Sequence, residues 1–307
     1  MSVLQTFSQL RNKALAWVDE FGDEDTTLRL MNNALTSAYQ AILFEHKWNF
    51  MLWSRPVTLT VVPGTQYYSL HPEFGRPAFF FNRTQREFLE EVTPQTLKDS
   101  GADWNTDTGA ALAFERAGRS PVASQPSTAS FLTVTSSVAA DGASQTVTVR
   151  GETADGPTEE TIACDTSGTT LFTHILSVRK NGTWSGTMTL AAGAQTLLKL
   201  FATEYGRSYQ QIHLLANPTA AEVIEYKFYR NPSPFAEDND IPDIPPGFHD
   251  ILVWEALLQF STYNAMEPGA IQLYTKNRDR LFVALQQHDI EGQSLDARTH
   301  YTTYVER

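Results

Sequence analysis

The sequence contains very little cysteine and comparatively little positive charge. Cys164 is the only cysteine among 307 residues, so no internal disulfide can form and a structural metal site built on cysteines is excluded. Lysine and arginine number 23 against 35 aspartates and glutamates, which gives a formal net charge of −12. A protein that binds nucleic acid by itself needs a cationic surface, and the overall charge argues against that class.

Long hydrophobic runs are also missing. No stretch approaches the roughly 18 consecutive apolar residues of a membrane helix, and we expect no contact with a membrane. Residues 1–25 do not combine a basic start with a long apolar run, so they do not resemble a signal peptide. The composition, 41% hydrophobic and 19% charged, is typical of a globular protein with one large or two medium domains.

The familiar motifs of catalysis and cofactor binding are absent. The sequence has no GxGxxG, P-loop, HExxH or GxSxG, and its 7 histidines are scattered without metal-ligand spacing. Two acidic runs, Asp19–Asp25 and Glu237–Asp243, lack the pattern of a calcium loop and are more typical of helix starts and solvated loops. We therefore expect no enzyme activity, no cofactor and no metal site, and we expect Cys164 to be a small buried hydrophobe.

Two amphipathic helices are expected at the start of the chain. The expected helices run from Leu4 to Phe21 and from Asp25 to His46. Apolar residues recur in them at steps of three and four, in the first at Leu4, Phe7, Leu10, Ala14, Trp17 and Phe21 and in the second at Leu28, Met31, Leu35, Ala38 and Ile42. The short stretch "FGDED" separates them, which favours an antiparallel helical hairpin. Residues 246–266 and 270–288 predict two more helices. The first of these is apolar on nearly every side and should be buried all round.

Between these pairs of helices the pattern changes to short strands. "RPVTLTVVPGTQYYSL" predicts a β-hairpin that turns at Pro63-Gly64, and "IHLLANPTAAEVIEYKFYR" predicts a strand, a turn and a strand. From 126 to 194 the chain is rich in Thr, Ser, Gly and Val, and turn signals separate five or six short strands. The abrupt change in amino-acid composition indicates an inserted all-β sandwich with Trp184 in its core.

The stretch "NPSPFAEDNDIPDIPPGFHDILVWEALLQF" joins a proline-rich, acidic segment to an apolar helix. Its prolines predict a stiff, extended connection that carries the chain from the β part back to the helices. Proline in the first turn of a helix costs nothing, because the missing N–H would have no partner there. The carboxylates that precede the helix favour its positive start.

The order of these pieces resembles the head-to-tail adaptor (connector) proteins of tailed bacteriophages. The resemblance rests on the two-helix start that ends in "HKWNFM", on the hairpin and the strand pair quoted above, and most specifically on "IPPGFHDILVWEAL". It covers roughly residues 1–120 and 195–290. The part around 130–194, with "ILSVRKNGTWSGTMTL", looks like the immunoglobulin-like insertions of phage structural proteins.

The expected fold class is therefore α+β. A helical-bundle host domain with a small β part takes up residues 1–125 and 195–290. An inserted, immunoglobulin-like all-β sandwich takes up residues 126–194. An extended C-terminal tail follows at 291–307, because that part shows no helical period.

The resemblance also implies a function. It points to a structural protein of the virion, made in the bacterial host cytoplasm, that assembles with itself into a ring at the head–tail junction, a dodecamer in the family. The implied partners are the portal protein and the tail or tail-completion proteins. Double-stranded DNA would pass through the channel without specific binding, since a negative wall repels phosphate.

Two sets of residues are candidates for these contacts. The C-terminal segment alternates strand-forming residues, which need a partner edge, and the tails of the adaptor family reach into the portal ring. The candidates for portal binding are Leu295, Thr299, Tyr301, Thr303 and Val305. The candidates for lining the DNA channel are Asp23, Glu24 and Asp25.

An alternative function stays open at this point. The chain could be a phage tail or baseplate protein whose β-sandwich binds a glycan of the host surface. Exposed aromatic side chains in the loops of residues 130–194 would favour that alternative. A deep cleft lined by paired carboxylates would instead favour an enzyme, and the sequence shows no sign of one.

Overall fold

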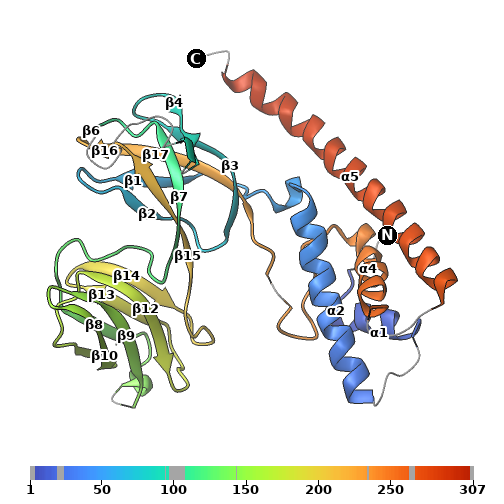
Figure 1. Cartoon of the computed structure of the whole chain (residues 1–307), viewed down its shortest axis with the longest axis horizontal. Coiled ribbons are helices and arrows are strands. Elements are labelled where there is room, and N and C mark those ends of the chain that lie inside the picture. Colours follow the sequence, from blue (N-terminus) through green and yellow to red (C-terminus); the bar gives the residue numbers. More distant parts are fainter. Residues whose placement is uncertain are drawn as a thin grey trace. The chain divides into compact units, whose positions relative to one another are not determined.

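The computed structural model of the chain contains helices and many strands, which confirms the mixed α+β class (Figure 1). It describes residues 4–18, 24–93, 95–96, 108–142, 144–233, 235–262 and 267–304, with the backbone alone for Glu24 and for 291–304. The chain divides into two compact units. The helical unit comprises Met1–Ser54 and Tyr229–Arg307, and the β unit comprises Arg55–Phe228.

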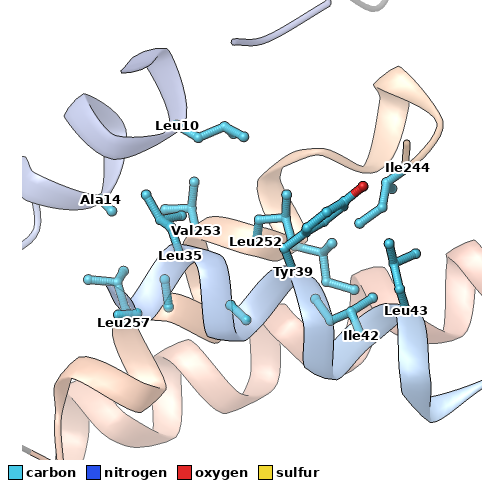
Figure 2. Packing of buried hydrophobic residues seen from close by; sticks show 14 of the residues in the cluster. Leu10, Ala14, Leu35, Tyr39, Ile42, Leu43, Ile244, Leu252, Val253 and Leu257 are labelled. Atoms are coloured by element: carbon cyan, nitrogen blue, oxygen red, sulfur yellow. The ribbon is translucent and has the colours of Figure 1, made fainter. Parts of the chain in front are cut away.

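Within the described residues, four α-helices form the helical unit. They are α1 (Phe7–Leu15), α2 (Glu24–Glu45), α4 (Asp250–Phe260) and α5 (Pro268–Tyr304), with short 3₁₀ turns η1 (Asn49–Met51) and η3 (Pro246–Phe248). Figure 2 shows side chains of α1, α2 and α4 meeting in one core, Leu10, Leu35 and Leu252 among them. These three side chains are fully buried. The predicted spacing of apolar residues in α2 is confirmed.

Helix α1 is shorter than the sequence suggests. Thr6 caps it, because its hydroxyl accepts from the Gln9 backbone N–H while the Gln9 side chain accepts from the Thr6 N–H. The helix ends at Leu15. The expected inward positions Leu4 and Trp17 are therefore outside the helix, and both are about half exposed.

The C-terminal segment is helical rather than extended. Helix α5 continues through Tyr304, and Val305 lies outside the described residues. A helix that already exists gains one hydrogen bond for each added residue without a new nucleation cost. The strand preference of Thr and Tyr, by contrast, takes effect only where a partner edge is present. The expectation of an extended tail was wrong for residues 291–304.

The β unit begins with two sheets of four strands each. Their orders are β1-β17-β3-β4 and β2-β15-β7-β5. The bounds in the first sheet are β1 (Val57–Val61), β17 (Glu222–Arg230), β3 (Phe74–Asn82) and β4 (Glu87–Phe88). The bounds in the second are β2 (Tyr67–Ser69), β15 (Tyr209–Leu215), β7 (Ala113–Ser120) and β5 (Glu90–Glu91). A parallel pair, β6 (Thr108–Gly109) with β16 (Asn217–Pro218), completes this part.

The predicted hairpin of residues 55–70 does not form, although both of its strands do. Strand β1 pairs with β17 and β2 pairs with β15, so the two neighbouring strands belong to different sheets. The turn at Pro63-Gly64 contacts the predicted turn at Asn217-Pro218, because the Gly64 N–H donates to the Pro218 carbonyl at 2.9 Å. Gly64 has φ +79°, which a residue with a side chain rarely adopts. Pairing with strands that are distant in the sequence therefore replaces the predicted pairing of β1 with β2.

Strands β8 to β14 build a second β part, here called the two-sheet module. The sheets have the orders β10-β9-β12 and β11-β8-β13-β14 and share one hydrophobic core. The bounds are β8 (Leu132–Ser136), β9 (Thr146–Thr153), β10 (Gly156–Ala163), β11 (Thr166–Ser167), β12 (His174–Asn181), β13 (Met188–Ala192) and β14 (Gln195–Leu200), with the 3₁₀ turn η2 (Ala139–Asp141).

The short strands predicted between residues 126 and 194 are confirmed, and Cys164 and Trp184 are buried in this core as expected. Burial, followed by the neighbouring Asp165 carboxylate, raises the pKa of the Cys164 thiol. Strand β14 pairs with β13, so the sheet continues past residue 194, where the sequence suggested a border. The boundaries between the two compact units also differ from the predicted domain borders, since they lie at 54/55 and 228/229.

Candidate assembly surfaces

The acidic, proline-rich segment of residues 231–249 is packed onto the first two helices. The ring of Phe235 stacks on Phe7 of α1 at a centroid distance of 4.7 Å and lies 4.6 Å from Tyr39 of α2. The segment thus contributes an apolar side chain to the same core as the helices. Its course is fixed before the chain enters α4.

The acidic residues of this segment bind the start of α1. The carbonyls of Asp240 and Asp238 accept from the backbone N–H groups of Phe7 and Ser8 at 2.8 and 3.0 Å. These N–H groups have no partner within their own helix. The Asp238 carboxylate also accepts two hydrogen bonds from Arg11, at 2.8 and 3.2 Å. The sequence suggested that these acids stabilise the following helix, and the structure shows that they bind α1.

A third acidic residue of the segment binds α2. The Tyr39 hydroxyl donates to the Asp243 carboxylate at 2.7 Å, and Arg230 donates to the other oxygen at 3.3 Å. Burial, and then the hydrogen bond to Asp243, raise the pKa of Tyr39 well above its usual value. The Glu237–Asp243 run therefore uses Asp238 and Asp243 to hold the fold together.

His249 closes the turn that leads into α4. It is 1% exposed, its Nε2 lies 2.8 Å from the Ile244 carbonyl, and the Gln5 backbone N–H donates to its Nδ1 at 3.3 Å. This pattern fits a neutral ring that carries its proton on Nε2. Burial lowers the pKa of His249 despite the opposing effect of the bond to Ile244.

Helix α4 is buried along most of its length, as its sequence predicts. Ile251, Leu252 and Leu257 are fully buried, whereas Trp254 is only partly buried. The Trp254 ring lies beside a surface pocket of about 310 Å³. The pocket is lined by Lys13, Ala16, Trp17, Asp250, Val253 and Trp254.

This pocket gives the helical unit an aromatic surface, here called the Trp17 patch (Lys13, Trp17, Asp250 and Trp254). Trp17 meets Trp254 edge-on at 5.2 Å and is 50% exposed. Lys13 pairs with Asp250 at 2.8 Å at the rim. Half-exposed tryptophan beside a shallow pocket and a charged rim is the composition that protein interfaces favour.

A second apolar surface lies on α5. Val283 and Ile290 are 51% and 58% exposed. Seven residues separate them, which puts both on nearly the same side of the helix. We call this surface the α5 stripe (Val283 and Ile290). It lies away from the buried α5 side chains Phe282 and Leu285.

Polar contacts fix α5 against the rest of the helical unit. Arg278 reaches Glu45 of α2 at 3.1 Å and Glu255 of α4 at 3.0 Å, and its guanidinium lies 5.0 Å from the centre of the Phe282 ring. Further along α5, the buried Asp289 carboxylate accepts from the backbone and side chain of Asn49 at 2.8 and 2.9 Å. Figure 1 shows α5 extending beyond the ends of α2 and α4.

The candidate residues predicted from the sequence lie at the start of α2 and near the C-terminal end of α5. Four of the portal-binding candidates lie on α5, namely Leu295, Thr299, Tyr301 and Thr303. Val305 and the channel candidate Asp23 lie outside the described residues. Glu24 is the first residue of α2, and Asp25 is exposed in its first turn. The structure does not bring the two sets of candidates together.

Sequence reasoning missed the Trp17 patch and the α5 stripe. Trp17 was assigned to a buried helix face. The exposed pair on α5 did carry a signal. Val283 and Ile290 are seven positions apart, and neither belongs to the set of apolar α5 residues that face inward, such as Phe282 and Leu285. Among the described residues, no three His, Cys, Asp or Glu side chains gather closely enough to hold a metal ion. No helix in the described ranges has the length and hydropathy needed to cross a membrane.

Comparison with known proteins adds one finding. Residues 5–141 match the family described as SU10 adaptor protein. The match supports a structural adaptor protein of a bacteriophage, and hence a component of the virion that interacts with other head or tail components. It covers α1, α2 and the strands up to β8, and it ends within the two-sheet module. No curated protein matches the chain.

Proposed function

We propose that the chain forms a ring between the portal and the tail of a phage, seals that joint and leaves a channel for DNA. The similarity of residues 5–141 to the SU10 adaptor family carries this proposal. The role is structural, and it requires no catalytic residue and no cofactor. The acidic start of α2, with Glu24 and Asp25, is our candidate for the channel wall, because like charge keeps phosphate from binding.

The helical unit offers what such a ring needs. A closed ring is built from a heterologous contact, in which one surface of a subunit meets a different surface of the next. The Trp17 patch and the α5 stripe are two different surfaces on one unit. The first is formed by α1, by Trp17 just after it and by α4, and the second by α5. We assign the subunit contact to these surfaces, with Trp17 as its aromatic anchor.

The contact with the portal is assigned to the C-terminal part of α5. The last buried side chain described on this helix is Asp289. The 15 residues that follow, through Tyr304, add about 22 Å of helix at 1.5 Å per residue. A helix of that length can reach a partner without disturbing the core of its own unit. The tail or tail-completion proteins would bind elsewhere on the ring.

Native mass spectrometry of the purified chain tests the subunit contact. We expect the wild type to form a closed oligomer and the double variant Val283→Glu with Ile290→Glu to form markedly less of it, because charge is placed on the α5 stripe. The matched control is Asn33→Glu with Ser37→Glu, which adds the same charge to exposed positions of α2. Far-UV circular dichroism checks that both variants keep their helices. Equal oligomer formation by both variants would refute the assignment of the α5 stripe.

A further inference from the structure

The two-sheet module carries a groove that the adaptor role does not use. Its volume is about 610 Å³, within the range of ligand sites for molecules of a few rings. Three segments form it: 129–131 before β8, the β9–β10 turn at 153–158, and 169–171 after β11. The lining residues are Ala129, Phe131, Thr153, Ala154, Asp155, Gly156, Pro157, Thr158, Thr169, Thr170 and Leu171.

Both walls of the groove are held in place by hydrogen bonds. In the β9–β10 turn, the Thr153 hydroxyl donates to the Gly156 carbonyl at 2.9 Å and accepts from the Asp155 N–H at 3.2 Å. On the other wall, the Glu160 carboxylate accepts from the Thr169 N–H and hydroxyl and from the Thr170 N–H, at 2.6, 2.9 and 3.1 Å. Burial opposes ionisation of Glu160, but these bonds outweigh it and lower its pKa.

The chemistry of the lining restricts the ligand. The lining holds four threonines, of which Thr153 and Thr169 already donate their hydroxyl protons to Gly156 and Glu160. The exposed Asp155 carboxylate makes no hydrogen bond or ion pair to any described residue. Phe131 and Leu171 are 50% and 47% exposed. Within the described lining there is no lysine, arginine or histidine, so a phosphate or another anion would meet no positive charge and would be repelled by Asp155.

A polyhydroxylated, uncharged ligand fits this combination. A carboxylate accepts hydrogen bonds from neighbouring hydroxyl groups, and a threonine hydroxyl whose proton is already donated can still accept one. The apolar face of a sugar ring packs its C–H groups on an aromatic or aliphatic side chain. A wholly apolar ligand would cover the Asp155 carboxylate without offering it a hydrogen bond, at a cost in free energy.

We propose that this groove binds a neutral saccharide, with Phe131 packing against a sugar ring and Asp155 accepting its hydroxyl groups. Such a site goes beyond the proposed ring and works independently of it. The groove is open, so a saccharide of two or three rings can enter without a change in the strands. The pairs β8–β11 and β9–β10 hold the segments that carry the lining residues.

Saturation-transfer NMR on the full chain tests the site. The probes are maltotriose, mannotriose and tri-N-acetylchitotriose, each measured separately. We expect transfer to at least one of them with a dissociation constant on the order of millimolar, which is about −4 kcal/mol of binding free energy. Phe131→Ala and Asp155→Asn should each weaken that binding by about tenfold, equivalent to 1.4 kcal/mol.

Two matched variants control for general effects of substitution. Leu176→Ala removes another exposed apolar side chain of the module, and Glu159→Gln neutralises another exposed carboxylate; both should bind as the wild type does. Thermal melting confirms that each variant is folded. Absence of transfer with all three sugars would overturn the proposal, and so would equal binding by the groove variants and the controls. Preferential binding of inorganic phosphate over the sugars would also contradict it.

Discussion

The hydroxyl of Tyr39 donates a 2.7 Å hydrogen bond to the carboxylate of Asp243, 204 residues further along the chain. The backbone N–H of Asp243 in turn donates to the same hydroxyl at 3.2 Å. This pair joins α2 to the segment that leads into α4. It explains in physical terms why a stiff acidic stretch precedes a buried helix: the stretch is itself packed against the helices and positions α4.

Tyr39→Phe should destabilise the helical unit by about 1 kcal/mol, since it leaves a half-buried Asp243 oxygen without its donor. The measurement is the urea midpoint of the helical signal in circular dichroism. Tyr205→Phe serves as the matched control, because Tyr205 is 69% exposed and should leave the midpoint unchanged. An unchanged midpoint for Tyr39→Phe would show that the Tyr39–Asp243 bond does not hold the segment.

Arg278→Met should cost more than the loss of an exposed ion pair. Arg278 joins Glu45 and Glu255, and the Glu255 side chain is only 14% exposed, so its charge would remain poorly solvated. We expect a loss of about 1–3 kcal/mol. Lys13→Met breaks the exposed pair with Asp250, where both side chains are about half exposed, and should cost less than about 1 kcal/mol. Equal losses in the two variants would contradict the assigned role of Arg278.

His249 should make the helical unit less stable in mild acid. Its pKa is lowered by burial in the folded protein, so as the pH falls through about 6.5 the unfolded chain takes up the proton first. The stability is therefore fully present above that pH and is lost as the pH falls toward the folded pKa. His249→Gln keeps a donor for the Ile244 carbonyl but does not titrate, and it should flatten the fall in stability between about pH 7 and 5.

The check is urea unfolding across that pH range for wild type and variant. His71→Gln is the comparison, because burial also lowers the pKa of His71, which lies in the β unit. It should flatten the pH dependence of the β signal and leave that of the helical signal intact. A helical signal whose pH dependence is the same in His249→Gln and in wild type would rule out His249 as its source.

The sequence predicted much of the local structure but not the long-range pairing. The spacing of Leu35 and Ile42 located α2, and the run from Ile251 to Leu257 located the buried α4. The partner of Val57 could not be found in the same way: Tyr226, which pairs with it, lies 169 residues further along the chain, beyond the two-sheet module, whereas a turn at Gly64 suggested a local hairpin. Turn signals show where the chain reverses, but they do not show which strands meet afterwards.

The candidate assembly surfaces were harder still to predict. Trp17 has the spacing of a core residue, and its exposure follows only from the end of α1 at Leu15. At the other end of the chain, Thr299, Tyr301 and Thr303 have strand preference, yet they continue an existing helix. In both cases the neighbouring structure, rather than the intrinsic preference of the residue, determined the outcome.

Truncation after Glu291 should separate portal binding from subunit assembly. The described buried side chains of α5 end at Asp289, so the shortened chain should keep its core and its oligomeric state. We expect it to lose binding to the portal in a pull-down assay. The control is the full-length variant Val283→Glu. It changes the α5 stripe but keeps the C-terminal segment, so it should still bind the portal. A truncated chain that still binds the portal as strongly as the full chain would disprove the assignment.

Electron microscopy of the purified chain mixed with the portal protein of its phage tests the central claim most directly. The account predicts closed rings of this chain stacked coaxially on the portal, with an open channel through both. A chain that remains monomeric in this mixture and does not associate with the portal would contradict the account.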